Sequence, residues 1–268
     1  MPALALPRPA LIGVVHLGAT PGAPRFEGDM GSVIERATAD ARALASGGCD
    51  AIIVENFGDV PFFVGTVPPE TVAAMALAVA EVRRACALPI GVNVLRNDAR
   101  SALALCATTG AVFLRVNVHA GAAVTDQGTI EGRAAETLRA RARLAPHVAI
   151  LADVHVKHAT PLGDESIGDA ARDALERGLA DGVIVTGRAT GRPPELALLT
   201  DVRERIGAAP LYVGSGLDDT NGAALLAVAD GAIVGTWLKR DGRVENPVDE
   251  ARVARLRTIV DRLRGPAG

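Results

Sequence analysis

Residues 148–186 read VAILADVHVKHATPLGDESIGDAARDALERGLADGVIVT, and this stretch decides the fold. It opens with the apolar run Val148–Val154, continues through an Ala-rich segment with helical periodicity at 165–178, and closes with the apolar run Gly182–Thr186. Runs that are apolar on both faces are typical of parallel strands covered by helices. The stretch therefore predicts one β–α–β unit of a parallel sheet.

The same pattern of strand and helix recurs along the whole chain of 268 residues. The other predicted strands are Leu11–His16, Ala51–Glu55, Pro89–Val94, Val112–Val118, Pro210–Gly214 and Gly231–Gly235. The other predicted helices lie at about 31–46, 69–86, 98–109, 131–145, 194–206, 219–228 and 247–264. Eight such units predict one α/β domain over residues 1–268, a (β/α)8 TIM barrel with no linker to a second domain. A doubly wound open sheet is the alternative, but it usually has fewer strands, and no GxGxxG follows the first run.

Three turns between a predicted helix and the next strand resemble one another. They are Gly47–Asp50, Gly178–Gly182 and Ala229–Gly231. Each ends a helix with a small residue and begins the next strand. We interpret them as quasi-repeats of one unit.

Composition limits the function classes. A hydrophobic content of 49% with a net charge of -3 excludes disorder for the bulk of the chain, and a pI near 6.0 gives no broad basic face for nucleic acid. Prolines and an arginine interrupt the apolar start of the chain, and no later run reaches about 18 apolar residues, so neither a signal peptide nor a membrane span is predicted. Cys49, Cys86 and Cys106 lack disulfide or metal spacing, which favours a reducing, cytoplasmic setting.

Lysine is scarce in this chain. The 28 basic residues include only two lysines, Lys157 and Lys239. Ala-, Arg- and Gly-rich usage indicates a coding bias that replaces lysine with arginine wherever any positive charge suffices. A lysine that persists points to its amine chemistry, with chance retention as the alternative. Lys239 follows the eighth run, where we expect a surface turn.

Polar residues gather at the ends of six predicted strands. In a TIM barrel these carboxyl ends form the active face, so we expect a binding site there rather than isolated buried polar groups. Side chains two apart on a strand share a face, which predicts that an Arg115–His119 set and an Asp153–Lys157 set line the barrel mouth. The residues assigned to substrate binding are His16, Asn93, Arg115, Asn117, His119 and Thr186.

Acid and base chemistry is assigned to Glu55, Asp153, His155 and Lys157. Asp153 as a base with Lys157 as an electrophile fits proton abstraction beside a carbonyl, while a desolvated Lys157 fits Schiff-base formation. Extended geometry places Asp153 and Lys157 about 13 Å apart, so their pairing requires the chain to turn after His155. The types of His16, Glu55, Asp153 and His155 also suit a divalent metal, although their spacing does not demand one.

Glycines end the seventh and eighth runs, where TIM barrels usually hold phosphate. Backbone N–H groups at such glycines can approach an anion closely. Asp218 follows these glycines and is expected to cap its own helix rather than face the anion. The residues predicted to form the phosphate site are Gly187, Gly214, Ser215, Gly216, Gly235 and Thr236.

Two long loops follow the second and fourth runs. The loop at 119–131 is punctuated by glycine and is a candidate lid, with an ordinary connection as the alternative. Four of the five phenylalanines fall in the first two loops, which favours a subunit interface of a homo-oligomer over an apolar pocket wall. These phenylalanines are Phe26, Phe57, Phe62 and Phe63.

Several motifs resemble the BtpA/SgcQ family from about residue 11 to residue 255. They include IGVVHLGATPGAPRF, IIVENFGDVPF, GVNVLRND, RVNVHAGAAVTDQGTIEG, ADVHVKHATPL, VIVTGRATG, VGSG and IVGTWLKRDGRVENPVD. The resemblance implies a phosphate-binding TIM barrel related to ribulose-phosphate-binding enzymes. One branch of the family is associated with photosystem I biogenesis, and another with sugar-uptake operons and a nucleotide-hydrolase label.

The sequence leads to two hypotheses about function, both of which can be tested. The first is an enzyme acting on a phosphorylated sugar or nucleoside-like molecule, by isomerase, lyase or glycosidic-bond chemistry. Phosphate-ester hydrolysis ranks lower because no Walker motif is present. The second is a non-catalytic assembly factor that binds a protein partner through Phe57, Phe62 and Phe63. The concentration of ionisable groups at strand ends favours the enzyme.

Overall fold

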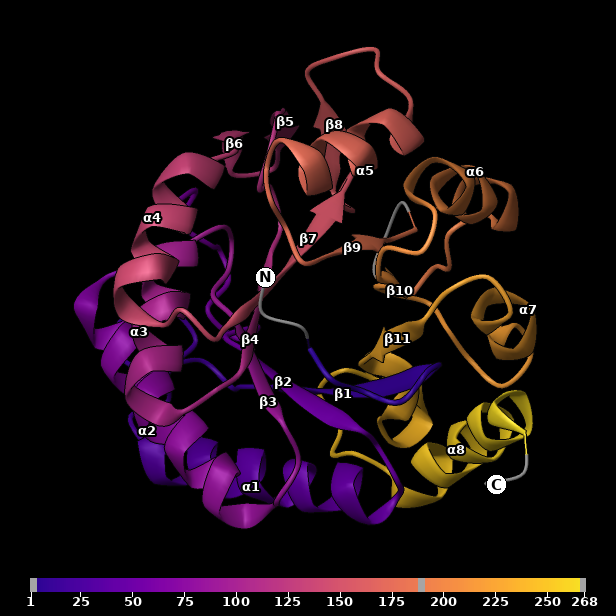
Figure 1. Cartoon of the computed structure of the whole chain (residues 1–268). Helices are drawn as coiled ribbons and strands as arrows, with labels where there is room; N and C mark the ends of the chain where they lie inside the picture. Colours follow the sequence, from indigo (N-terminus) through magenta and orange to yellow (C-terminus); the bar gives the residue numbers. More distant parts are fainter. Residues whose placement is uncertain (1–3, 188–190, 266–268) are drawn as a thin grey trace.

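A closed barrel of eight parallel strands forms the centre of the computed structural model, which describes residues 4–187 and 191–265 (Figure 1). Its strands run in the order β1-β2-β3-β4-β7-β9-β10-β11 and close by pairing of β11 with β1. Their bounds are β1 Ala10–His16, β2 Ala51–Glu55, β3 Ile90–Asn93, β4 Phe113–Val116, β7 Ala149–Val154, β9 Gly182–Val185, β10 Leu211–Val213 and β11 Gly231–Val234. The TIM-barrel prediction is confirmed, and each predicted run overlaps one of these strands to within two residues at either end.

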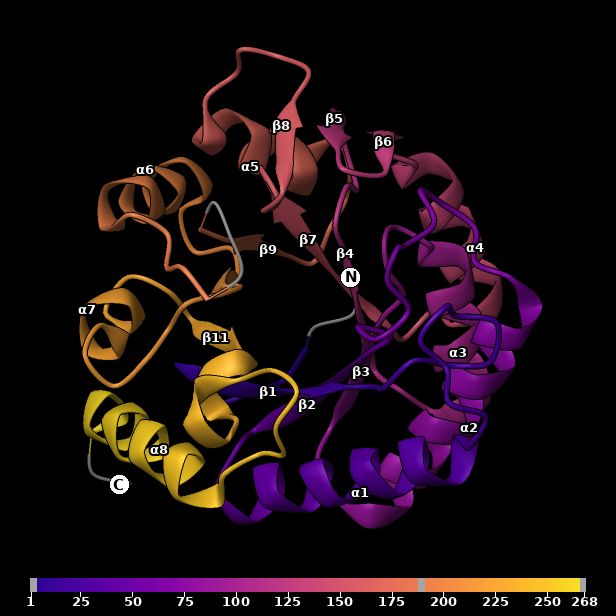
Figure 2. The same ribbon diagram turned by 180° about the vertical axis from the view of Figure 1, so that it is seen from behind.

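The described residues form eight α-helices, which surround the barrel as an outer ring in both views (Figures 1 and 2). They are α1 Met30–Ser46, α2 Pro69–Ala85, α3 Ala99–Thr109, α4 Ala134–Leu144, α5 Ile167–Glu176, α6 Leu196–Ile206, α7 Gly222–Leu226 and α8 Glu250–Arg264. Two short 3-10 helices, η1 Thr236–Leu238 and η2 Arg240–Gly242, follow β11. Helix α7 is much shorter than predicted, because Asp218 and Asn221 form a hydrogen-bonded turn before it.

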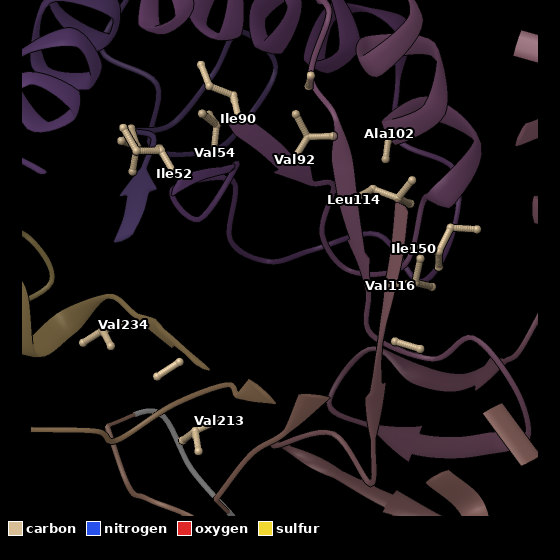
Figure 3. Close-up of a cluster of buried hydrophobic side chains, with 14 of the residues drawn as sticks. Ile52, Val54, Ile90, Val92, Ala102, Leu114, Val116, Ile150, Val213 and Val234 are labelled. Carbon is tan, nitrogen blue, oxygen red and sulfur yellow. The ribbon is translucent and has the colours of Figure 1, made fainter. Parts of the chain in front are cut away.

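Alternation along the strands sorts the apolar residues into two layers. One layer packs between the strands and the helices; Figure 3 shows Leu114 of this layer near Ala102 of α3, with Ile52 and Val92 in the same cluster. The second layer fills the barrel itself and includes Ile12, Ile53 and Phe113. Burying each such Val, Leu, Ile or Phe side chain is worth about 1.5–3 kcal/mol. The next inward position holds a polar residue on six of the strands and a glycine, Gly214 or Gly235, on β10 and β11.

The three similar turns carry one repeated contact. Asp50, Asp181 and Asp230 precede β2, β9 and β11, and each accepts a hydrogen bond from the N–H of the first or second residue of the neighbouring strand at 2.8–2.9 Å. Each carboxylate also binds arginine, as Asp181 binds Arg141 at 2.5 Å. The aspartates therefore fix the amino ends of three strand pairs with the same device, which supports the interpretation as quasi-repeats.

A small antiparallel sheet is absent from the sequence prediction. The candidate lid loop forms a hairpin of β5 (Ala122–Thr125) and β6 (Gly128–Glu131), and β8 (Ala159–Pro161) pairs with β5. Both ribbon views place this sheet at the rim of the barrel near α5 (Figures 1 and 2). Its inner face buries Ala123 and Ile130 against Val118 and Val156. The loop after β4 is therefore an ordered extension of the barrel rim.

The position of Lys239 differs from the surface turn that was expected from the sequence. Its side chain is fully buried, and its ammonium binds Asp40 of α1 at 2.5 Å. Asp40 also accepts a hydrogen bond from the Val248 N–H at 2.7 Å. The surface-turn prediction was wrong because this lysine joins the segment after β11 to the first helix.

Candidate active site

The inward-facing side chains at the carboxyl ends of the strands form one polar layer. Val14 of β1 faces the barrel core, so His16 two residues later faces the mouth. Strand register places Glu55 beside His16 and Asn93 beside Glu55. The prediction that polar strand ends meet at the mouth is confirmed for these three residues.

Arg115 occupies the middle of this layer. Its guanidinium donates to both carboxylate oxygens of Asp153 at 3.0–3.2 Å, and both side chains are almost fully buried. Asn117 donates to the same carboxylate at 2.6 Å. Asn93 in turn donates to the Asn117 side-chain oxygen at 3.1 Å, while its own Oδ1 is buried without a partner among the described residues. These contacts fix four predicted site residues in one network.

The network changes the role of Asp153. Burial alone would lower the pKa of Arg115, but the adjacent Asp153 carboxylate outweighs it and raises that pKa above its ordinary value. Arg115 therefore remains a cation in the mouth. Asp153 accepts hydrogen bonds from Arg115 and Asn117 and lines a different cavity from the ones that Arg115 lines, which makes it a positioning residue in this geometry.

Glu55 and Lys157 carry the charges that remain available. Both line the same cavity, and no ion pair within 4.0 Å joins either side chain to a described residue. Burial lowers the pKa of Lys157, and the positive charges of Arg115 and Arg96 lower it further against the opposing effects of Glu55 and Asp153. A carboxylate and an amine of reduced basicity thus face one cavity without neutralising each other.

The chain turns sharply where Lys157 enters the mouth. Strand β7 ends at Val154, and His155 adopts a left-handed conformation with a φ of 48°. The Lys157 N–H donates to the Thr186 hydroxyl at 3.0 Å, and its carbonyl accepts from Arg96 at 2.7 Å. The turn after His155 required by the sequence argument is present, although Lys157 does not pair with Asp153. Thr186 holds the turn and does not line the cavity.

His155 and His119 do not join the mouth. His155 lines a separate cavity with Glu165, Asp173 and Arg177, beside the small sheet and α5. His119 is buried, and its Nε2 lies 2.8 Å from the Gly178 carbonyl oxygen after α5. The prediction failed for both because β4 and β7 end at Val116 and Val154, so strand alternation no longer sets side-chain direction beyond them. Burial lowers the pKa of both histidines.

His16 presents a neutral ring to the cavity. Burial is the main reason that its pKa lies well below the ordinary value, and the cations Lys239 and Lys157 add to the shift. The ring packs edge-on against Phe57 with centroids 4.7 Å apart. Gly235 gives it space, because a Cβ there would lie 2.6 Å from the His16 Cε1.

The loops after β10 and β11 form another wall of the cavity. Gly214, Ser215 and Gly216 line it together with Gly235 and Thr236. Gly216 has a φ of 71°, and a Cβ there would collide with the backbone of Arg192. The Asp218 carboxylate accepts hydrogen bonds from Thr220 and Asn221, which outweigh burial and lower its pKa. Asp218 nevertheless contributes to the lining of the cavity.

Two members of the predicted phosphate site have structural contacts. Gly187 does not line the cavity, and its N–H lies 3.3 Å from the Ser215 hydroxyl, to which it donates. Ser215 donates onward to the Arg192 carbonyl at 3.1 Å. Gly187 and the Ser215 hydroxyl therefore connect the loops after β9 and β10. The part of the cavity wall that lacks such structural contacts consists mainly of glycine backbone and Thr236.

The cavity has a volume of about 340 Å³, and a second cavity of about 210 Å³ shares Glu55, Phe57, Arg115 and Lys157 with it. The second cavity adds Phe62 and five residues that were not assigned from the sequence: Leu95, Arg96, Asp126, Gln127 and His158. Arg96 follows Asn93 by only three residues, and Asp126 and Gln127 form the turn of the β5–β6 hairpin. An Asp-Gln-Gly turn between β-branched residues was the available signal for this hairpin.

The phenylalanines divide between two surroundings. Phe57 lines both cavities and Phe62 lines the second, so these two contribute to the apolar pocket wall that was the alternative, while the subunit interface stays a prediction. Phe63 is 56% exposed. The four candidate metal ligands do not converge either, since His155 faces a different cavity, and the described residues contain no group of three metal-binding side chains.

The fold and the mouth define a TIM barrel that resembles ribulose-phosphate-binding barrels. Thiamine phosphate pyrophosphorylase from Pyrococcus furiosus matches with a TM-score of 0.59 and 16% identity over 96% of this chain and 98% of that one. N-(5'-phosphoribosyl)anthranilate isomerase from Pyrococcus furiosus matches with a TM-score of 0.58 and 14% identity over 94% and 98%. At such identities the likeness shows the fold alone.

The chain belongs to the BtpA family, whose model matches residues 8–262. It is 50% identical over 244 residues to the photosystem I biogenesis protein BtpA of a Synechocystis strain, covering 91% of this chain and 85% of that protein. An uncharacterised protein of Thermococcus kodakarensis is 49% identical over 257 residues, covering 96% and 97%. No helix in the described part of the chain is long and apolar enough to cross a membrane.

Proposed function

We propose that this protein is an enzyme that acts on a phosphorylated sugar or nucleoside-like molecule. One observation carries the proposal: an unpaired carboxylate, Glu55, and an unpaired amine, Lys157, line the same cavity as the glycine-rich ends of the seventh and eighth barrel strands. A scaffold gains nothing from a buried carboxylate and a half-buried amine that lack partners, whereas acid–base chemistry requires such groups free.

The phosphate is assigned to the wall after β10 and β11. Gly214, Gly216 and Gly235 leave backbone close to the cavity, and Thr236 adds a hydroxyl. These are the seventh and eighth strands in barrel order, whose loops usually bind phosphate in this fold. Arg115 supplies a buried positive charge near this wall, since its Nη2 lies 3.5 Å from the position of a Cβ built on Gly214.

The rest of the substrate is assigned to the second cavity. Arg96 and Gln127 offer donors there, while Asn93 offers an unpartnered oxygen. Phe57 supplies an apolar face against which a sugar ring can pack. Mixed donors and acceptors beside an aromatic ring suit a polyhydroxylated molecule better than a purely anionic one.

Glu55 and Lys157 are assigned the proton transfers. The supported reactions are isomerisation, lyase cleavage or cleavage of a glycosidic bond, each of which needs a base and an acid on one substrate. Arg115 and Asn117 orient the substrate, and Asp153 holds Arg115 in place.

A thermal-shift panel tests the proposal. Sugar phosphates and nucleoside monophosphates should raise the melting temperature, since ligand at 100 times its Kd adds about 2.7 kcal/mol to stability. The unphosphorylated sugars and nucleosides are the matched controls and should give smaller shifts. Thr236→Asp and Ser215→Asp should abolish the phosphate-dependent shift while the ligand-free proteins still melt cooperatively. A panel with no shift from any phosphate contradicts the proposal.

A second candidate is a role in assembly of a protein complex. It is favoured by the name of the Synechocystis relative and by the exposed Phe63 and its neighbour Val64, which is 39% exposed. Phe63→Ser with Val64→Ser should abolish binding to a partner protein and leave phosphate-dependent stabilisation intact. If Glu55→Gln loses partner binding instead, the result would favour the barrel mouth as the surface that binds the partner protein.

A further inference from the structure

Lys157 is held in a position where its amine is free to react. Its backbone is fixed on both sides, by the Thr186 hydroxyl at 3.0 Å and by Arg96 at 2.7 Å, while its side chain lines both cavities of the mouth. No carboxylate lies within 4.0 Å of its Nζ in the described part of the chain. The lysine is therefore anchored at its main chain and unoccupied at its amine.

The other lysine shows the opposite arrangement. Lys239 is fully buried, pairs with Asp40 at 2.5 Å and lines neither cavity of the mouth. Burial lowers the pKa of both lysines, but only Lys157 has two cations, Arg115 and Arg96, acting on it from within the mouth. A buried amine near other cations is the arrangement that makes a lysine nucleophilic at neutral pH. The two lysines thus serve as a reactive amine and an internal control.

Glu55 completes the arrangement from the opposite side. Its carboxylate lines the same two cavities, lacks hydrogen-bond partners among the described residues, and lies more than 4.0 Å from the Lys157 ammonium. A substrate carbon therefore has room between the two groups. Glu55 can take a proton from the nitrogen and return one to the oxygen of a bound carbonyl compound.

We propose that Lys157 forms a Schiff base with the carbonyl carbon of a phosphorylated aldehyde or ketone bound in the mouth. The inference rests on the proposed function and narrows its substrate class to carbonyl compounds. It accounts for an amine that is anchored and unpaired and that lies opposite an unpaired carboxylate.

Schiff-base formation proceeds through a carbinolamine. The Nζ lone pair forms a bond to the carbonyl carbon, and the carbonyl π electrons move to the oxygen. Glu55 transfers one proton from nitrogen to that oxygen, which gives a carbinolamine. The hydroxyl group accepts one further proton, delivered from solvent through Glu55, and leaves as water while a C=N bond forms. The resulting iminium withdraws electrons from the adjacent carbon, whose proton or carbon substituent Glu55 can then help to remove.

Reductive trapping tests the inference on the intact protein. The probes are dihydroxyacetone phosphate and glycolaldehyde phosphate, with sodium borohydride supplying the hydride that reduces C=N to a stable amine. Peptide mapping by mass spectrometry locates the adduct among only two lysines and the N-terminal amine. We expect one adduct per chain, on Lys157, with glycolaldehyde lacking phosphate as the matched control that reacts far less.

Two variants sharpen the result. Lys157→Arg keeps the charge and should lose the adduct, while its melting temperature shows that it folds. Glu55→Gln should form the adduct about 100-fold more slowly, which is the size of a typical acid–base contribution. An adduct at Lys239 or the N-terminus in equal yield would overturn the inference, and mapping of the unsubstituted protein gives that result without any variant.

The outcomes separate the inference from the proposed function. No adduct, together with phosphate-dependent stabilisation by the same probes, refutes the Schiff base and leaves phosphate binding intact. An adduct on Lys157 that inorganic phosphate does not suppress supports the Schiff base and refutes the assigned phosphate wall. If neither an adduct nor phosphate-dependent stabilisation is observed, both the Schiff base and the proposed function are refuted.

Discussion

The contacts of Arg115 separate the polar residues of the mouth into those that hold the site together and those that can react with a ligand. Its bidentate contact with Asp153 uses both carboxylate oxygens, and Asn117 adds a third donor to the same group. A buried arginine–carboxylate pair of this geometry costs free energy when one partner is removed, because the other is left charged and desolvated. The pair therefore leaves Glu55 and Lys157 as the groups able to exchange protons with a ligand.

The lowered pKa of His16 gives a pH prediction. Because the ring stays neutral in the folded protein and ionises in the unfolded chain near its ordinary pKa of 6.5, the unfolded state binds more protons below that pH. The free energy of unfolding should fall as the pH drops below about 6.5, with His16 contributing up to about 1.4 kcal/mol per pH unit. Urea titrations from pH 7 to pH 5 should give a shallower fall for His16→Asn.

The exposed His147 provides the control. The slope of the free energy of unfolding against pH is compared between His16→Asn and His147→Asn, which is the same substitution at an exposed position. A fall that is unchanged in His16→Asn would show that the neutral His16 ring makes no contribution to acid sensitivity.

At the scale of elements, the repeated aspartate turns explain how the barrel holds its register. Asp181 accepts from the Ile150 N–H at 2.8 Å and binds Arg141 at 2.5 Å, so one carboxylate joins β7, β9 and α4. Asp50 and Asp230 repeat the contact at two other strand pairs. Each turn ties a strand to its neighbour at the end opposite the mouth.

Asp181→Ala should therefore destabilise the protein by about 2–3 kcal/mol, since a buried N–H and a nearly buried arginine lose a charged partner. Equilibrium urea unfolding measures the loss. Asp173→Ala removes an ion pair with Arg177 on the exposed side of α5 and should cost less than about 1 kcal/mol. Equal effects of the two substitutions would contradict the assigned role of the turn.

Sequence reasoning succeeded where regular structure continues. Within strands, alternation placed His16, Glu55, Asn93 and Arg115 on the inner face, and the glycine-rich ends of the last two strands line the same cavity. It failed beyond two strand ends, at His155 one residue past β7 and at His119 three residues past β4. His155 turns at a φ of 48° and leaves the mouth, an outcome set by tertiary packing that no two-residue period contains.

The long contacts were also beyond the sequence pattern. The pairing of Lys239 with Asp40 joins residues 199 apart, so the local sequence at either position does not predict the contact. The β5–β6 hairpin did have a local signal in its Asp-Gln-Gly turn, but its pairing with β8 depends on a segment after β7. Local patterns thus define the strands and much of the mouth, whereas the contacts between distant loops decide which polar groups remain free.

At the scale of the whole molecule, barrel closure brings the two halves of the site together. Glu55 and Arg115 come from the first half of the barrel, whereas the Gly214–Gly216 and Gly235–Thr236 backbone comes from the last two strands. Pairing of β11 with β1 places Gly235 against His16. The cavity consequently exists only in the closed barrel, and its ligand should stabilise the fold as a whole.

Calorimetric titration with ribose 5-phosphate tests the central claim most directly, namely that the mouth binds a phosphorylated compound through the loops after β10 and β11. The account predicts one site per chain, competition by inorganic phosphate, and loss of binding in a folded Thr236→Asp variant. Glu55→Gln should retain binding, since it leaves the phosphate wall unchanged. Absence of binding by the unsubstituted protein, or unchanged binding in Thr236→Asp, would contradict the account.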